Sequence, residues 1–118
     1  MRVLLVAPHK RRGVLLRYLR EKALYTVTTV GSWDGAKKFL GQQEEVIIFT
    51  PEVADDILRE FSLLKNASQA KTLFLTDWPY DKRIWRLLTV GLDSYCLLNL
   101  DKLEIVLNKV QNNYIFLD

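Results

Sequence analysis

The sequence predicts a single α/β domain in which five parallel strands form an open, doubly wound sheet. Short apolar runs alternate with amphipathic stretches along the 118 residues, and no repeat, low-complexity tract or Pro/Gly/Ser linker interrupts them. The apolar runs are continuous, which is typical of strands covered by helices on both sheet faces. Because crossovers between parallel strands are right-handed, we expect the flavodoxin-like strand order 2-1-3-4-5.

The first elements follow from simple patterns. Residues 3–6 form an apolar run that predicts a buried strand, and residues 10–22 carry apolar side chains at helical spacing. Residues 25–30 are rich in β-branched side chains and predict a second strand. Ser32 is a candidate N-cap for a helix that glycine can end at about Gly41.

The third strand and its helix come next. Residues 46–49 form another apolar run, and Thr50 followed by Pro51 is the pattern of a helix start. Helical spacing then relates the apolar residues Ala54, Ile57, Leu58, Phe61 and Leu64. The third helix is therefore expected to begin directly after Thr50.

The remaining elements are strands at residues 72–75 and 94–98 and helices at residues 81–90 and 101–110. Gly91 can end the fourth helix, and Asp101 with Glu104 forms a capping box at the start of the fifth.

Bulk composition excludes several classes of protein. Hydrophobic residues make up 49% of the chain, which is too apolar for a disordered protein. No apolar run reaches the roughly 18 residues of a membrane helix, and the amino terminus lacks a signal-peptide pattern. The net charge of +3 is weak evidence for nucleic acid. The lone Cys96 lies in an apolar run, so we expect a buried thiol, a reducing cytoplasm and no membrane partner.

Ligands of such sheets bind beyond the carboxyl ends of the strands. The residues there are Ala7-Pro8, Thr50, Thr76-Asp77 and Leu98-Asn99, of which Asp77 alone is acidic. No strand is followed by Gly-x-Gly-x-x-Gly or by P-loop spacing. We therefore expect no enzymatic activity, no cofactor and no metal site.

Element order and spacing resemble the receiver domains of bacterial response regulators over residues 3–110. Asp34-Gly35 is similar to the family's glycine at the second helix, and Thr76 stands where receivers have Ser or Thr. The stretch at residues 91–95, Gly-Leu-Asp-Ser-Tyr, resembles the family's Gly-Ala-Asp-Asp-Tyr. Residues 100–104 resemble its entry into the last helix.

The resemblance also implies which functional positions differ. Receivers have two acidic residues that hold magnesium where this chain has Ala7 and Pro8, and a phosphoacceptor aspartate where it has Thr50. Their phosphoryl-binding lysine corresponds to Leu98, and the proline after it to Asn99. Neither Ala7 nor Pro8 can ligate a hard cation, and a hydroxyl cannot form an acyl phosphate. The chain therefore resembles a pseudo-receiver, and such domains act as protein-interaction modules.

Two hydroxyl positions and one aromatic ring have more than one interpretation. Thr50 is either an N-cap before Pro51 or a site of modification, and capping is favoured. Thr76 and Tyr95 match the family's switch pair. Without a phosphoryl group we expect Tyr95 to be a packed or interfacial ring, although a protein partner could take the place of phosphate in biasing it.

The predicted first helix is basic. Its cations are Lys10, Arg11, Arg12, Arg17, Arg20 and Lys22. A solvated face is the favoured interpretation, docking to an acidic partner through Lys10, Arg17 and Arg20 is the second, and nucleic-acid binding is the third. His9, just before these cations, is interpreted as a loop residue.

The predicted fourth helix combines aromatic and basic residues. Its surroundings contain Trp78, Tyr80, Lys82, Arg83, Trp85 and Arg86, whereas Ile84, Leu87 and Leu88 are the better core candidates. Trp and Arg are enriched at binding hot spots. In receivers the fourth helix, fifth strand and fifth helix form the usual dimerisation or output face. We therefore predict an interface of Lys82, Trp85, Arg86 and Tyr95, and we expect Trp33 to be a packing residue.

The leading hypothesis is a signal-transduction pseudo-receiver that binds a protein partner or a second copy without phosphorylation. The alternatives are a nucleic-acid-associated regulatory domain that uses the basic first helix, and a small-ligand sensor that uses the crevice at the carboxyl ends of the strands.

Overall fold

A computed structural model describes residues 2–21, 25–76 and 81–97, and they form a five-stranded sheet with helices on both faces. The strands are β1 (Arg2–Val6), β2 (Thr26–Val30), β3 (Val46–Phe49), β4 (Lys71–Thr76) and β5 (Ser94–Leu97). All pairings are parallel and the strand order is β2-β1-β3-β4-β5. The predicted fold class and strand order are confirmed.

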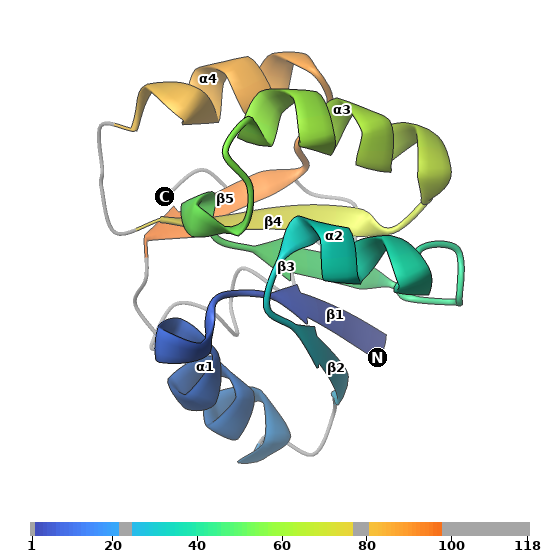
Figure 1. Ribbon diagram of the computed structural model, residues 1–118, viewed down its shortest axis with the longest axis vertical. Coiled ribbons are helices and arrows are strands. Elements are labelled where there is room, and N and C mark those ends of the chain that lie inside the picture. The colour runs from blue at the N-terminus through green and yellow to red at the C-terminus, as the bar shows by residue number, and fades with distance from the viewer. Residues whose placement is uncertain (1, 22–24, 77–80, 98–118) are drawn as a thin grey trace.

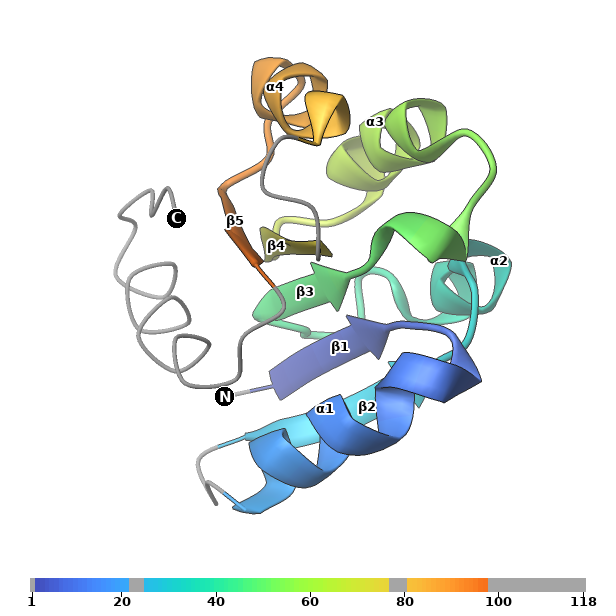
Figure 2. The ribbon, with the colours of Figure 1, turned by 90° about the vertical axis from the view of Figure 1, so that its left-hand side faces the viewer.

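The helices divide between the two faces of this sheet. Helix α1 (His9–Glu21) covers one face, and α2 (Trp33–Ala36), α3 (Ile57–Ala67) and α4 (Lys82–Thr89) cover the other (Figures 1 and 2). Short 3₁₀ turns follow β3 and α2, at η2 (Pro51–Val53) and η1 (Lys37–Phe39). Because β1, β3 and β4 pair in parallel, their carboxyl ends lie at one edge of the sheet.

Each face has its own apolar core. On the α2–α4 face the ring of Phe49 lies 5.4 Å from Trp33, 5.5 Å from Phe61 and 5.2 Å from Phe74, measured between centroids. Such edge-on and stacked contacts add to the stability that burial of the rings provides. On the α1 face, Cys96 is buried among aliphatic side chains. The expected roles of Trp33 and Cys96 are confirmed.

Three element boundaries differ from the prediction. The third helix does not begin after Thr50: α3 begins at Ile57, where the carboxylate of Asp56 accepts a hydrogen bond from the backbone N–H of Arg59 at 3.1 Å. Ser32 does cap a helix, but that helix is a single α turn continued by a 3₁₀ turn. His9 is not in a loop, because α1 begins there.

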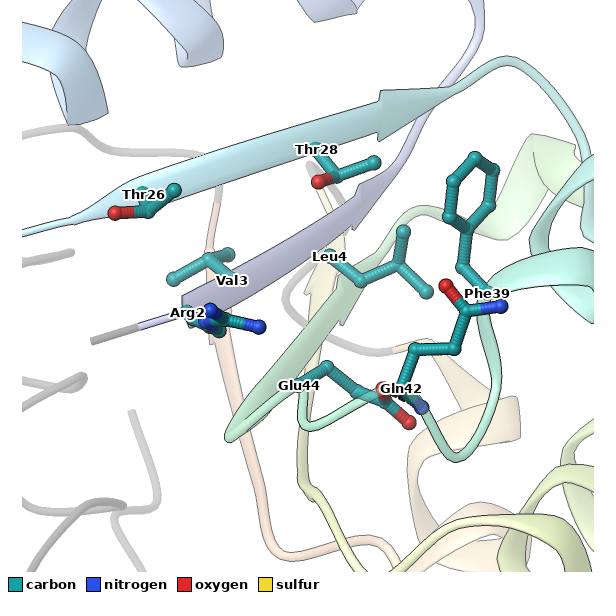
Figure 3. A pocket seen from close by; sticks show the side chains of 8 residues that line it. All are labelled: Arg2, Val3, Leu4, Thr26, Thr28, Phe39, Gln42 and Glu44. Carbon is teal, nitrogen blue, oxygen red and sulfur yellow. Dashed lines mark hydrogen bonds between the residues drawn. The ribbon is translucent and has the colours of Figure 1, made fainter.

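The short α2 leaves part of the sheet uncovered. On its side of β2, Thr26 and Thr28 are exposed, and they line a hollow of about 220 Å³ opposite Phe39, Gln42 and Glu44 (Figure 3). The expectation that both faces are fully covered is therefore wrong at this corner. The hollow lies beside the amino-terminal halves of β1 and β2, away from the edge where ligands of such sheets bind.

The predicted fifth helix lies outside the described residues, as do Asp77, Trp78, Tyr80, Leu98 and Asn99. Within the described part of the chain, no helix has both the length and the apolar character that a membrane span requires.

Candidate functional site at the carboxyl edge of the sheet

The carboxyl ends of β1 and β3 present little chemistry. Ala7 is fully buried, and its backbone N–H donates to the carbonyl of Val30 at 3.0 Å. Pro8 is half-buried. These two side chains provide no oxygen ligand, which a hard cation needs.

Thr50 follows β3 at the centre of this edge. Its backbone N–H donates to the carbonyl of Val6 at 3.2 Å, and its side chain is 0% exposed. Its hydroxyl has no hydrogen-bond partner among the described residues. The predicted capping role is wrong: the 3₁₀ turn closes between the N–H of Val53 and the backbone carbonyl of Thr50, with no side-chain cap.

Thr76, at the end of β4, is held by the start of α4. Its hydroxyl donates to Oδ2 of Asp81 at 3.1 Å. The same carboxylate receives Nε of Arg83 at 2.8 Å on Oδ1 and Nη2 at 2.7 Å on Oδ2. Oδ1 also accepts the backbone N–H of Arg83 at 3.0 Å, so Asp81 is the N-cap of α4.

Asp81 is charged despite its burial. Only 5% of its side chain is exposed, against 44% for Arg83. Burial raises the pKa of Asp81, but the hydrogen bonds from Arg83 and Thr76 outweigh it and hold the pKa below its ordinary value. A fixed negative charge therefore lies beside the hydroxyl of Thr76.

The sequence analysis treated residue 81 only as a helix start and missed this cluster. An aspartate before a helix signals an N-cap. The available clue was Arg83, two residues after Asp81, because a guanidinium at this spacing can donate two hydrogen bonds to the carboxylate of the N-cap. Thr76 itself was identified. Leu98, which corresponds by resemblance to the phosphoryl-binding lysine of receivers, lies outside the described residues.

No cluster of three or more His, Cys, Asp or Glu side chains suited to a metal ion occurs within residues 2–21, 25–76 and 81–97. Asp81 is already engaged by Arg83 and Thr76. The arrangement at this edge can fix the entry to α4, and its charge is unfavourable for a bound anion.

The predicted interface residues of α4 lie at the surface. Trp85 is 73% exposed, and Lys82 and Arg86 are exposed beside it. Ile84 and Leu87 are buried, which confirms them as core residues, and Leu88 packs half-buried against the same core. Lys82 and Arg86 have no acidic partner within the described part of the chain.

Tyr95 and the basic first helix lie elsewhere. Tyr95, on β5, is half-buried and packs against the core cluster that contains Ile84 and Leu87 of α4, so its place in an interface stays a prediction. Arg17 and Arg20 are exposed on α1, on the opposite face of the sheet. Lys10 is in α1, and the position of its side chain is not described.

A second hollow, of about 360 Å³, lies between the start of α2 and the segment that joins β3 to α3. Its lining contains the acidic residues Asp34, Glu52, Asp55, Asp56 and Glu60, the apolar residues Trp33, Val53 and Ala54, and Arg59. Sequence reasoning missed it, because its carboxylates come from segments that only the fold brings together.

Several solved structures with the same fold are response regulators or receiver domains. A LuxR family DNA-binding response regulator from Silicibacter pomeroyi superposes with a TM-score of 0.84 at 17% identity, over 100% of this chain and 97% of that one. A CheY-like receiver domain protein from Methanospirillum hungatei gives a TM-score of 0.77 at 18% identity, over 95% and 94%.

A third structure holds a phosphoryl group and a cation. It is a response regulator from Burkholderia pseudomallei with a phosphorylated aspartic acid, a calcium ion and citrate; its TM-score is 0.75 at 19% identity, over 94% of this chain and 69% of that one. No protein-family model and no curated protein matches the sequence. At these identities the likeness shows the fold of a receiver domain.

Proposed function

We propose that this chain is a pseudo-receiver: a signal-transduction domain related to two-component response regulators that acts through protein–protein interaction and accepts no phosphoryl group. It has no enzymatic activity and needs no cofactor, and it works in the cytoplasm, where its buried Cys96 stays reduced.

The observation that carries this proposal is the Asp81 carboxylate beside Thr76. Its oxygen lies 3.1 Å from the threonine hydroxyl. An incoming phosphoryl oxygen would have to displace the Asp81 carboxylate from the hydroxyl of Thr76, and two anionic oxygens side by side repel each other. Phosphoryl transfer depends on charge stabilisation by metal and cation, and neither Ala7 nor Pro8 supplies an oxygen ligand for a metal ion.

The interaction itself is assigned to the α4 surface. Trp85 combines a large aromatic area with 73% exposure, and Lys82 and Arg86 flank it. Exposed aromatic and arginine side chains are the usual anchors of protein interfaces. On α1, the exposed cations Arg17 and Arg20 accompany Glu21 and a half-buried Tyr18, which makes it the weaker candidate for a protein or nucleic-acid partner.

Incubation with acetyl phosphate and magnesium, followed by intact mass spectrometry, tests the loss of phosphorylation. We expect the mass to stay unchanged, while a receiver domain that retains its aspartate gains one phosphoryl group under the same conditions. Stoichiometric labelling of this chain, mapped to any residue of the carboxyl edge, would overturn the proposal.

A further inference from the structure

Two oppositely charged surfaces lie on the same side of the sheet. The first, which we call the α4 patch, consists of Lys82, Trp85 and Arg86. The second, the acidic hollow, is the 360 Å³ hollow between α2 and the β3–α3 segment. Helix α3 lies between α2 and α4, so the patch of one molecule cannot enter its own hollow (Figure 1).

The two cations of the α4 patch form a like-charged pair on one helix. Lys82 and Arg86 are four residues apart, and like charges at this spacing destabilise a helix by about 0.2–0.5 kcal/mol. Neither cation has an acidic partner within the described residues. Trp85 leaves most of its ring in water. The patch is thus complementary to something acidic that has room for an aromatic ring.

The acidic hollow has these properties. The side chains of Asp34, Glu52, Asp55 and Asp56 are exposed around it. Its apolar lining includes the half-buried Ala54 and the buried Val53. Five acidic residues and Arg59 line the hollow, and Lys37 pairs with Asp34 at 3.2 Å and with Glu60 at 3.6 Å. The five carboxylates outnumber these two cations, so the local charge is negative although the whole chain has a net charge of +3.

We propose that the α4 patch of one molecule docks into the acidic hollow of a second copy. This proposal rests on the proposed function, because it names the partner of the same α4 surface. Trp85 contacts Val53 and Ala54, while Lys82 and Arg86 approach Glu52 and Asp55. Every copy carries both halves of the contact, so no other chain is required for the charges to match.

The contact is expected to be weak and sensitive to salt. One helix face and one hollow bury less than the roughly 1,000 Å² total of a stable interface. Its charges are exposed, and the Debye length shrinks from about 10 Å at 0.1 M salt to about 3 Å at 1 M. Association should therefore appear at high protein concentration and decline as salt is added.

Sedimentation velocity over a range of protein and salt concentrations tests the contact, with circular dichroism to verify folding. We expect the average mass of the wild type to rise with concentration at low salt. The pair Lys82→Glu with Arg86→Glu, the pair Glu52→Lys with Asp55→Lys, and Trp85→Ala alone should each weaken association at least about tenfold.

The pair Arg17→Glu with Arg20→Glu is the matched control. It changes the net charge by the same amount as the α4 pair, but on the opposite face of the sheet. We expect it to leave self-association within about twofold of wild type. If the control also loses association, the change in net charge explains the loss, and the assignment of the contact to the α4 patch is overturned.

Mixing the two charge-reversed variants provides a decisive arm. Each variant alone loses the charge match between the patch and residues 52 and 55, whereas in the mixture the acidic patch of the first variant meets the two lysines introduced in the hollow of the second. Association should therefore return only in the mixture. Failure to return, or a wild type that stays monomeric at every concentration, would overturn self-docking. The acetyl phosphate experiment does not depend on self-association, so it tests the proposed function independently of self-docking.

Discussion

Two threonines at the carboxyl edge show how position decides what a hydroxyl contributes. Thr50 and Thr76 are both buried, and they end neighbouring strands. Thr76 donates to Asp81, whereas the Thr50 hydroxyl has no partner among the described residues. A buried hydroxyl without a partner retains the cost of its lost hydration, about 1–3 kcal/mol.

Replacement of each threonine by valine should therefore have opposite effects. Thr50→Val removes an unsatisfied group, so we expect the free energy of unfolding to rise by about 1 kcal/mol. Thr76→Val removes a donor from a buried carboxylate and should lower it by about 1–3 kcal/mol. Urea denaturation measures both. A destabilised Thr50→Val variant would show that the hydroxyl has a bound water or another partner.

Asp81 gives the molecule a defined acid sensitivity. Its folded pKa lies below the ordinary value of about 3.9. The stability that ionised Asp81 contributes is therefore complete above about pH 4 and is lost as the pH falls through the folded pKa. Burial raises the pKa of Glu44, but hydrogen bonds from Gly41, Ser68 and Gln42 outweigh burial and lower it. Glu44 therefore also stabilises the fold above its pKa and loses this contribution in acid.

The substitution Asp81→Asn isolates one of these two groups. Asparagine still caps a helix, but it loses the charge-assisted bonds to Arg83, so we expect a loss of about 1–3 kcal/mol at pH 7. The difference from wild type should shrink as the pH falls below about 4 and through the lowered pKa of folded Asp81, because the wild-type carboxylate then becomes neutral as well. A difference that stays constant over this range would show that the charge of Asp81 is not what stabilises α4.

At the scale of elements, one side of α4 packs in the core and stabilises the fold, whereas the other side is exposed. Leu87 is fully buried, whereas Trp85 is mostly exposed two positions earlier. We expect Leu87→Ala to cost about 2–5 kcal/mol and Trp85→Ala to change stability by less than about 0.5 kcal/mol. Thermal unfolding measures both. A large loss for Trp85→Ala would mean that its ring covers the core, and the surface would then lose its main candidate anchor.

How well the sequence predicts an element depends on how many residues its pattern spans. Continuous apolar runs located β1, β3 and β4, because a buried parallel strand has no polar face. The start of α3 was wrong because Thr50-Pro51 is a local pattern that a 3₁₀ turn also satisfies, and the stronger cap is Asp56. The acidic hollow and the Thr76–Asp81 contact need the fold as well: Asp34 reaches the hollow from a distant segment, and Thr76 meets Asp81 only because the fold brings the end of β4 beside the start of α4.

At the scale of the whole molecule, the sheet has the fold of a receiver domain, and three uncharged residues follow β1 and β3 at its carboxyl edge. The strand order and the 0.84 TM-score describe the same scaffold as a response regulator. The positions after β1 and β3 now carry Ala7, Pro8 and Thr50. If the scaffold alone fixes where ligands converge, carboxylates returned to these three positions should meet at one point.

The triple variant Ala7→Asp, Pro8→Asp, Thr50→Asp tests this geometry. Three carboxylates in a buried edge repel one another and lose hydration, so we expect a lower Tm than wild type in EDTA. A magnesium ion that binds only the folded state should reverse part of the loss, by about 2.7 kcal/mol at a hundredfold excess over Kd. Scanning calorimetry with and without magnesium measures this. The matched triple asparagine variant has similar bulk but no charge, and its Tm should not respond to magnesium. Equal responses of the two variants would mean that the edge of this sheet does not bring its strand ends together as a receiver does.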